Sequence, residues 1–150
     1  MKIALASDHG GYDLKSKIAG YLTANHIAFI DYGCGAGESV DYVDFAVKAI
    51  AGIQSGDCDR AILVCGTGMG MALAANKFKG IRATTCWNAY TAEMSRKHND
   101  SNCLTLGGRT VPADQAFEIV EIWLKMPFEG GRHARRLGKV GEIEERNFRP

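Results

Sequence analysis

A cysteine and a glycine-rich turn end a short apolar run in residues 61–70. Cys65 closes the run, and Thr67 and Met69 alternate in the turn with three glycines, Gly66, Gly68 and Gly70. Glycine lets a backbone approach a ligand closely. A helix that begins directly after the turn would present N–H groups with no partner and a partial positive charge. Such a helix start stabilises an anionic oxygen and also a thiolate on Cys65, so the turn offers a base and an oxyanion site side by side.

The same turn also fits purely structural interpretations. A cysteine that ends a buried strand often acts only as a small hydrophobic residue, and glycines often serve the close packing of a helix on a strand. Two nucleotide motifs fit poorly. No Gly-Lys-Ser/Thr follows, as a Walker A loop requires. Met71 stands where a dinucleotide fingerprint has its third glycine, and the acidic ribose ligand expected about 20 residues on is missing.

Further polar residues flank the other apolar runs, namely Asp8, His9, His98, Asn99 and Arg109. Each also has a structural alternative. Asp8 could cap a helix and His9 could be a surface loop residue. His98 could end a helix favourably as a cation, and Asn99 could stop that helix. Taken together, the five residues predict one crevice in which they converge with the glycine turn.

Residues 128–150 form a tail of different composition. Three arginines and a histidine lie within residues 132–136, and Arg132 and Arg136 would point the same way on a helix. Paired arginines suit bidentate binding of phosphate, whereas the alternative is a charged face in water. Because the tail has few apolar residues, it cannot supply much core, and we expect it to pack against a second subunit.

Alternating apolar patterns predict the elements that must position these residues. Five strands are expected at residues 2–6, 27–30, 61–65, 81–86 and 103–106. Five helices are expected between and after them. Three show apolar faces, at Leu14/Ile18/Leu22, at Val40/Val43/Val47/Ile50, and at Phe117/Val120/Leu124 after Pro112. The other two are expected at residues 71–77 and 90–98. This alternation indicates a parallel sheet with helices on both faces, and such sheets bind ligands at the carboxyl ends of their strands.

Composition limits the class of protein. The 150 residues are 46% hydrophobic and 23% charged, which suits one globular domain with a substantial core over residues 1–150. A net charge of +1 indicates neither a nucleic-acid nor a membrane partner, and no apolar run is long enough to span a bilayer. Five cysteines without a C-x-x-C pair predict neither a disulfide framework nor a structural zinc site, and a reducing cytoplasm fits them.

Six ordered motifs resemble the ribose-5-phosphate isomerase B family, which includes galactose-6-phosphate and allose-6-phosphate isomerases. They lie at residues 7–12, 65–70, 75–77, 80–82, 95–100 and 130–133. The resemblance runs from Lys2 to about Asn147. It implies a Rossmann-like fold, a homodimer or dimer of dimers, and no metal or organic cofactor. It also implies aldose–ketose isomerisation of a sugar phosphate through a cis-enediolate.

The resemblance further implies a role for each site residue. Cys65 is then the base that moves a proton between C1 and C2, and Thr67 is a hydroxyl partner of the enediolate oxygen. The backbone amides of Gly66, Gly68, Met69 and Gly70 form the hole for that oxygen. His98, with Asp8, opens the furanose ring.

The remaining implied roles concern substrate binding. The phosphate ligands are then His9, Arg109, Arg132 and Arg136. Asn99 binds the sugar, and Tyr42 lies beside the substrate. The resemblance also implies sites shared between subunits, with His98 and Arg109 crossing over. We therefore expect Cys65 and His98 of one pocket to come from different subunits.

Three positions depart from the family pattern. Met71 stands where some members carry a glutamate base, which places this protein with the cysteine-using branch. Val43 follows Tyr42 where many members have proline, and residues 85–89 are not the usual run. Trp87 within that run is bulky and could reshape the sugar pocket.

These observations favour an isomerase of ribose 5-phosphate and ribulose 5-phosphate over several alternatives. The nearest is the same chemistry on a hexose 6-phosphate of the allose or galactose type. A second is a non-catalytic module that binds sugar phosphates or nucleotides, although pure binding has no use for Cys65, His98 and Asp8 together. A thiol redox enzyme or phosphatase is a third, but the Cys-x5-Arg loop of phosphatases is absent and no resolving cysteine lies nearby.

Overall fold

A five-stranded parallel sheet forms the centre of the molecule. The computed structural model describes residues 1–37 and 39–148. The strands lie in the order β2-β1-β3-β5-β4, and every neighbouring pair is parallel. Their bounds are Lys2–Ser7 for β1, Ala28–Asp31 for β2, Arg60–Cys65 for β3, Ala83–Thr85 for β4 and Cys103–Gly107 for β5.

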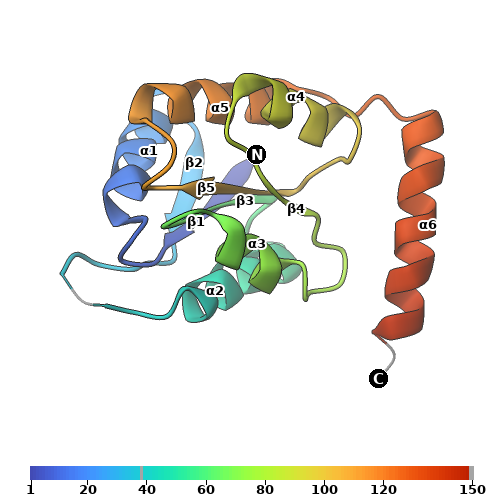
Figure 1. The fold of residues 1–150 in the computed structure, drawn as a ribbon, viewed down its shortest axis with the longest axis horizontal. Helices are drawn as coiled ribbons and strands as arrows, with labels where there is room; N and C mark the ends of the chain where they lie inside the picture. Colours follow the sequence, from blue (N-terminus) through green and yellow to red (C-terminus); the bar gives the residue numbers. More distant parts are fainter. Residues whose placement is uncertain (38, 149–150) are drawn as a thin grey trace.

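Helices cover both faces of this sheet (Figure 1). Helices α1 and α5 contact each other, as do α4 and α5, and these three lie on one face, whereas α2 and α3 lie on the other. The last helix, α6, stands beside the β4 edge as an arm. The bounds are Tyr12–Ala24 for α1, Tyr42–Gln54 for α2, Met69–Ala75 for α3, Ala89–Lys97 for α4, Ala113–Lys125 for α5 and Arg132–Asn147 for α6. The predicted fold class, with its C-terminal helical tail, is confirmed.

The two faces of the sheet have cores of different character. On the α1/α4/α5 face, large side chains such as Ile62, Leu104 and Trp123 are fully buried. On the α2/α3 face the sheet presents small residues, including Ala4 and Ala6, so those helices lie close to the strands. The predicted inner face of α1 is confirmed, since Leu14, Ile18 and Leu22 are all buried.

The predicted inner face of α2 is wrong except at Ile50, which is fully buried. Its buried residues are Ala46, Ala49, Ile50 and Gly52, and Val40 precedes the helix. Val43 and Val47 are 42% and 40% exposed. Alanines at i and i+3, Ala46 and Ala49, let α2 approach the sheet, and this turns the two valines outward. The pattern of large apolar residues therefore identified the helix but not the face that it buries.

Two other predicted elements differ in detail. In α5, Phe117 and Leu124 are only partly buried, whereas Ile119 and Trp123 are fully buried. Strand β4 is shorter than predicted. The N–H of Arg82, just before it, donates to the side chain of Asn102 and not to a neighbouring strand.

The chain leaves β1 and β3 in opposite directions, which opens a crevice at their carboxyl ends. Glycines let the loops around this crevice meet closely. A Cβ on Gly11 would lie 2.5 Å from the carbonyl carbon of Val64, and one on Gly108 would lie 2.6 Å from the main-chain oxygen of Gly10. Both obstacles are backbone atoms, so no side-chain movement could relieve them.

Among the described residues, no helix combines the length and the apolar character that crossing a membrane would require.

Gly11→Ala should therefore destabilise the protein by about 1–3 kcal/mol, because the added carbon overpacks β3. The matched control is Gly20→Ala on the exposed side of α1, where a Cβ meets nothing within 4 Å. That change should stabilise the protein by about 0.5–1 kcal/mol through helix propensity. Urea unfolding of both variants measures the difference. Equal free energies of unfolding for the two would contradict close packing at Gly11.

Candidate active site

Cys65 ends β3 with its sulfur against the start of α3. The N–H of Gly68 donates to Cys65 Sγ over 3.1 Å, and the Cys65 side chain is buried. Gly68 is the N-cap of α3 and has a φ of +82°, a left-handed conformation that favours glycine. The Gly68 N–H and the start of α3 therefore direct partial positive charge at the sulfur.

Asp8 and Arg109 lie next to this turn. The N–H of Asp8 donates to Val64 O over 3.2 Å, which holds the β1 loop against β3. The position of a Cβ on Gly10 would be 3.4 Å from both Asp8 Oδ1 and Arg109 Nη2, and 3.2 Å from the nitrogen of Gly66. A carboxylate, a guanidinium and the glycine turn therefore surround one small space. Asp8 also has its structural role, because its Oδ1 accepts the N–H of Gly11.

Three more predicted residues complete this group. His9 Nδ1 lies 3.2 Å from both the oxygen and the nitrogen of Val40. The ring of Tyr42 covers Gly70, where a Cβ would lie 2.8 Å from Cζ. Thr67 is exposed, and its hydroxyl accepts the N–H of Met69 over 3.4 Å. We call these residues the strand-end group: Asp8, His9, Tyr42, Cys65, Gly66, Thr67, Gly68, Met69, Gly70 and Arg109.

His98 and Asn99 lie at the opposite end of the sheet, near the amino ends of the strands. Helix α4 starts after the carboxyl end of β4 and runs back to the amino end of β5, and His98 is its C-cap. The expected convergence with the glycine turn therefore does not occur within one chain. The expectation that Arg109 crosses over with His98 is also wrong, because its guanidinium lies beside Gly10 and Gly66 of its own chain.

The base of α6 adds two residues that the sequence reasoning missed. The rings of His98 and His133 stack with centroids 4.1 Å apart and planes 5° apart. Glu129 Oε2 lies 3.9 Å from Nε2 of each histidine. Glu129 and His133 stand four residues apart, and that spacing was the available signal. We call His98, Asn99, Glu129, Arg132, His133 and Arg136 the arm group.

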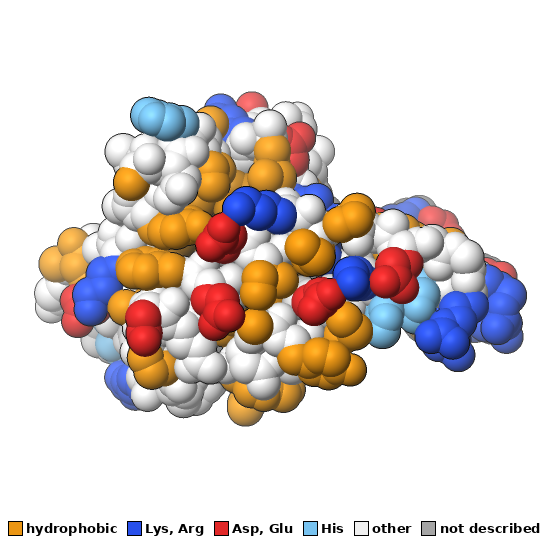
Figure 2. Space-filling model, turned by 90° about the horizontal axis from the view of Figure 1, so that it is seen from above, with side chains coloured by type: hydrophobic (Ala, Val, Ile, Leu, Met, Phe, Trp, Pro, Cys, Tyr) orange, Lys and Arg blue, Asp and Glu red, His pale blue; other side chains and the backbone are white. Residues whose placement is uncertain are grey.

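The arm group lies in a positive environment. Lys97 Nζ is 3.8 Å from Glu129 Oε1, and Arg132 Nε donates to His133 Nε2 over 3.4 Å. Arg132 and Arg136 are both exposed at the start of α6. Figure 2 shows Lys and Arg side chains gathered on the arm, with histidines beside them. One carboxylate among several cations suits an anionic ligand such as phosphate.

The donor set of His98, Glu129 and His133 could also bind a metal by composition, since its ligand atoms lie within 4.8 Å of one another. The geometry fits poorly. Two parallel imidazoles direct their nitrogen lone pairs along parallel planes and not toward a common centre. The adjacent Arg132 and Lys97 would also repel a cation.

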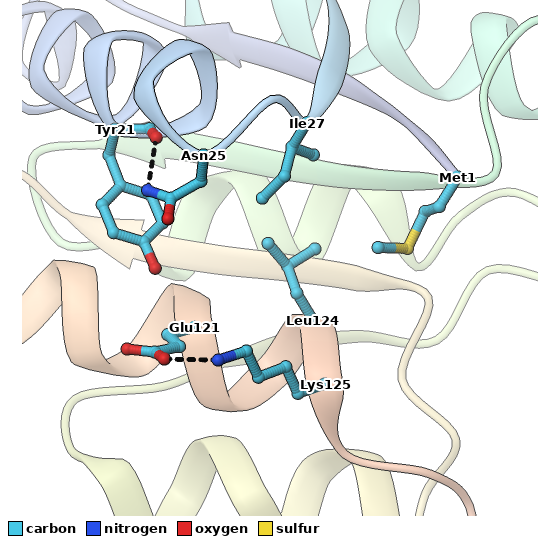
Figure 3. Close-up of a pocket in the computed structure, with 7 residues that line it drawn as sticks. All are labelled: Met1, Tyr21, Asn25, Ile27, Glu121, Leu124 and Lys125. Carbon is cyan, nitrogen blue, oxygen red and sulfur yellow. Dashed lines mark hydrogen bonds and ion pairs between the residues drawn. The ribbon is translucent and has the colours of Figure 1, made fainter.

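Two hollows differ in their relation to the site. One, of about 220 Å³, adjoins the glycine turn, with Thr67, Met69 and Trp87 among its lining residues. Trp87 is 59% exposed and lines this hollow, so its bulk limits what fits there. The other, of about 270 Å³, lies between α1 and α5 at the amino ends of the strands (Figure 3). Its lining carries the Glu121–Lys125 ion pair and no residue of either group.

Comparisons with known proteins agree with the fold. The sequence profile of the Ribose/Galactose Isomerase family matches residues 3–140. Ribose-5-phosphate isomerase B of Escherichia coli is 43% identical over 145 residues, which cover 97% of each chain. D-erythrulose-4-phosphate isomerase of Pectobacterium atrosepticum is 39% identical, over 96% of this chain and 95% of that one. The structure of Clostridium thermocellum ribose-5-phosphate isomerase B matches with a TM-score of 0.95 and 55% identity, over 97% of this chain and 99% of that one.

The fold and these relatives together define a sugar-phosphate isomerase. The chain belongs to the ribose/galactose isomerase family, because the family profile matches residues 3–140. The predicted family and enzyme class are thereby confirmed.

The buried histidine of the arm group gives a prediction for the pH dependence of stability. Burial lowers the pKa of His133 below its ordinary value, and the nearby His98 and Arg132 lower it further. The unfolded chain then binds the proton more readily than the folded one. Stability is full above the unfolded pKa of about 6.5 and falls as pH drops toward the lower folded pKa.

In His133→Asn, the loss of unfolding free energy between pH 7.5 and 5.5 should be smaller than in wild type. Urea unfolding at both pH values measures each slope, and the slope is read separately from any loss at pH 7.5 that comes from broken packing. Parallel slopes in the two proteins would contradict a depressed pKa for His133.

Proposed function

We propose that the protein interconverts ribose 5-phosphate and ribulose 5-phosphate, with Cys65 as the base. The observation that carries this proposal is the contact between the Gly68 N–H and Cys65 Sγ at the start of α3. The names of the Escherichia coli and Clostridium thermocellum relatives support the choice of sugar. The relative named for erythrulose 4-phosphate leaves substrate length open within the family, so a hexose 6-phosphate stays the alternative.

The proposed reaction has two parts. His98, with Asp8, first opens the furanose ring by giving a proton to the ring oxygen and taking one from the C1 hydroxyl. The Cys65 thiolate then takes the C2 proton, and the resulting cis-enediolate places negative charge on an oxygen that faces the turn amides. The thiol returns the proton to C1 while a hydroxyl proton moves from O2 to O1. No electron leaves the sugar, so the step uses no redox cofactor.

The phosphate is held away from the reacting carbons in this proposal. His9 and Arg109 bind it from the strand-end group, and Arg132 and Arg136 bind it from the arm group. Charge-assisted contacts of this kind fix the sugar in one orientation and so lower the entropic part of the barrier. Asn99 and Tyr42 contact the sugar between the two ends.

The division into two groups supports a shared site in a homodimer. Each chain carries both groups, but they lie at opposite ends of its sheet. A pocket that contains both must therefore take the strand-end group from one subunit and the arm group from the other. An exposed apolar surface adjoins the glycine turn on α2 and α3: Tyr42, Val43, Val47, Met69 and Leu73. Val140 and Ile143 are likewise exposed on α6. Apolar surfaces of this kind mark interaction sites, and we infer that the arm of one subunit packs on the α2/α3 face of the other.

The remaining expectations belong with this proposal. Residues 1–150 act as one domain with the tail as its dimer arm, and a dimer of dimers remains the alternative assembly. A reducing cytoplasm suits the cysteines, because all five are buried thiols in the described part of the chain.

An isomerase assay over a panel of aldose phosphates tests the sugar and the base together. Ribose 5-phosphate should give the highest kcat/KM, and Cys65→Ala should lower its turnover by at least about a hundredfold through loss of the base. The variant replaces one small residue by another, so its unfolding free energy serves as the control. Wild-type turnover in Cys65→Ala would return Cys65 to a packing role. Preference for a hexose 6-phosphate would correct the sugar alone.

Mixed dimers test the shared site. Chains with Cys65→Ala and chains with His98→Asn are refolded together in equal amounts. If one pocket takes these residues from different subunits, a mixed dimer holds one intact pocket and one with both changes. Random pairing makes about half the dimers mixed, so activity should recover to roughly a quarter of wild type. No recovery above the separate variants, with mixed dimers shown to be present, would place both residues in one subunit.

A further inference from the structure

Three charged residues of the family-like motifs have no part in the proposed chemistry. Arg82, Arg96 and Asp100 surround the segment that carries His98 and Asn99. The Asp100 carboxylate accepts Arg96 Nη1 at Oδ1 and Arg82 Nη2 at Oδ2, each over 2.9 Å. Arg82 Nε also donates to the main-chain oxygen of Asp100 over 2.9 Å. Asp100, two residues after the proposed ring-opening histidine, therefore bridges the two arginines. We call Arg82, Arg96 and Asp100 the clamp.

The clamp holds a backbone turn that side chains rarely adopt. Asp100 has a φ of +44°, in the left-handed region. Its N–H donates to Arg96 O over 3.1 Å, just as the N–H of His98 donates to Met94 O over 2.9 Å. A left-handed residue at this point reverses the chain after α4 and sets the direction of His98 and Asn99. Such a conformation persists when the surrounding contacts determine it, and the two arginines supply those contacts.

The same contacts reach the base of the arm. Arg96 has a side chain only 5% exposed, and its Nη1 also donates to Ser101 O over 2.6 Å. Its Nε donates to Met126 O over 3.4 Å, at the residue that ends α5. The N–H of Glu129 in turn donates to Lys97 O over 3.0 Å. Asp100 thus joins the start of β4, the end of α4 and, through Arg96, the end of α5.

We propose that Asp100, clamped by Arg82 and Arg96, is a positioning residue that holds His98 and Asn99 in the orientation needed for ring opening. The inference rests on the proposed function, in which His98 opens the ring and Cys65 moves the proton. Both carboxylate oxygens of Asp100 accept from arginines, and no hydrogen bond or ion pair joins Asp100 to the strand-end group among the described residues. Its loss should therefore slow ring opening and leave proton transfer at Cys65 almost unchanged.

The two sugars separate these steps. Ribulose 5-phosphate has no furanose form, because the hydroxyl that would close the ring carries the phosphate. Exchange of its C1 hydrogen with solvent deuterium needs only the base and the enediolate hole. Isomerisation of cyclic ribose 5-phosphate needs ring opening as well. The ratio of the two rates therefore reports on His98 and not on the general stability of the fold.

Asp100→Asn keeps the size of the side chain and removes its charge, so it cannot hold both arginines as before. It should lower kcat for ribose 5-phosphate at least about tenfold, since small misplacement of a catalytic group is costly. The kcat of deuterium exchange in saturating ribulose 5-phosphate should stay within about twofold of wild type. His98→Asn should show the same selective pattern. Equal loss in both reactions, or no loss in either, would overturn the proposal.

The matched control is Glu93→Gln, which removes a carboxylate and its ion pair with Lys97 from the same helix without touching the turn. It should change neither rate. Arg82→Lys removes part of the clamp from the β4 side and should give a weaker form of the same selective loss. It also replaces Asp100→Asn if that variant does not fold.

Amide hydrogen exchange separates this inference from the proposed function. A peptide spanning residues 94–102 should take up deuterium faster in Asp100→Asn than in wild type or Glu93→Gln. If the wild type acts on neither ribose 5-phosphate nor ribulose 5-phosphate, the proposed function is wrong, and this measurement alone decides whether Asp100 holds the turn. Unchanged uptake in Asp100→Asn would overturn the positioning role whatever the substrate.

Discussion

The structure depends on one constraint of parallel sheets. Each connecting helix must carry the chain from the carboxyl end of one strand back to the amino end of the next. Residues at the carboxyl ends of strands, such as Asp8 and Cys65, therefore lie at the same end of the sheet. A residue at the end of a returning helix, such as His98, lies at the opposite end and cannot join them in the same chain. This separation is the main reason for proposing that two subunits build each site. It also gives the α6 arm and the exposed apolar residues of α2 and α3 a common purpose.

At the carboxyl ends of the strands, the contacts that pack the loops closely also position the residues proposed for catalysis. The glycine contacts that bring the β1 and β5 loops together also bring Arg109 beside Asp8 and the turn. The positive φ of Gly68 lets its N–H face Cys65 Sγ. A buried cysteine with a donated N–H is both a packed residue and a candidate base. The structural interpretation of this turn therefore supports the functional one.

Charge on the arm follows a different rule from charge at the turn. At the turn, backbone dipoles act on a buried sulfur, and the formal charges beside it are one carboxylate, Asp8, and one guanidinium, Arg109. At the base of α6, exposed arginines stand beside two stacked imidazoles and a single carboxylate. Exposed arginines suit a phosphate that arrives and leaves, whereas preorganised dipoles suit charge that develops during a reaction. In the proposed site, the turn amides would face the reacting carbons, and the arm arginines would join His9 and Arg109 at the phosphate.

The sequence by itself determined the element order, the parallel sheet and the residues worth testing, because apolar periodicity and glycine-rich turns are local signals. It identified Cys65 and the arginines of the tail, and the spacing of Glu129 and His133 held a further signal. Only the tertiary structure decided which face α2 buries, since alanines and not valines approach the sheet. The tertiary structure also divided the site residues between the two ends of the sheet and joined Asp100 to Arg82. Such relations depend on the path of the chain through space, which residue spacing does not encode.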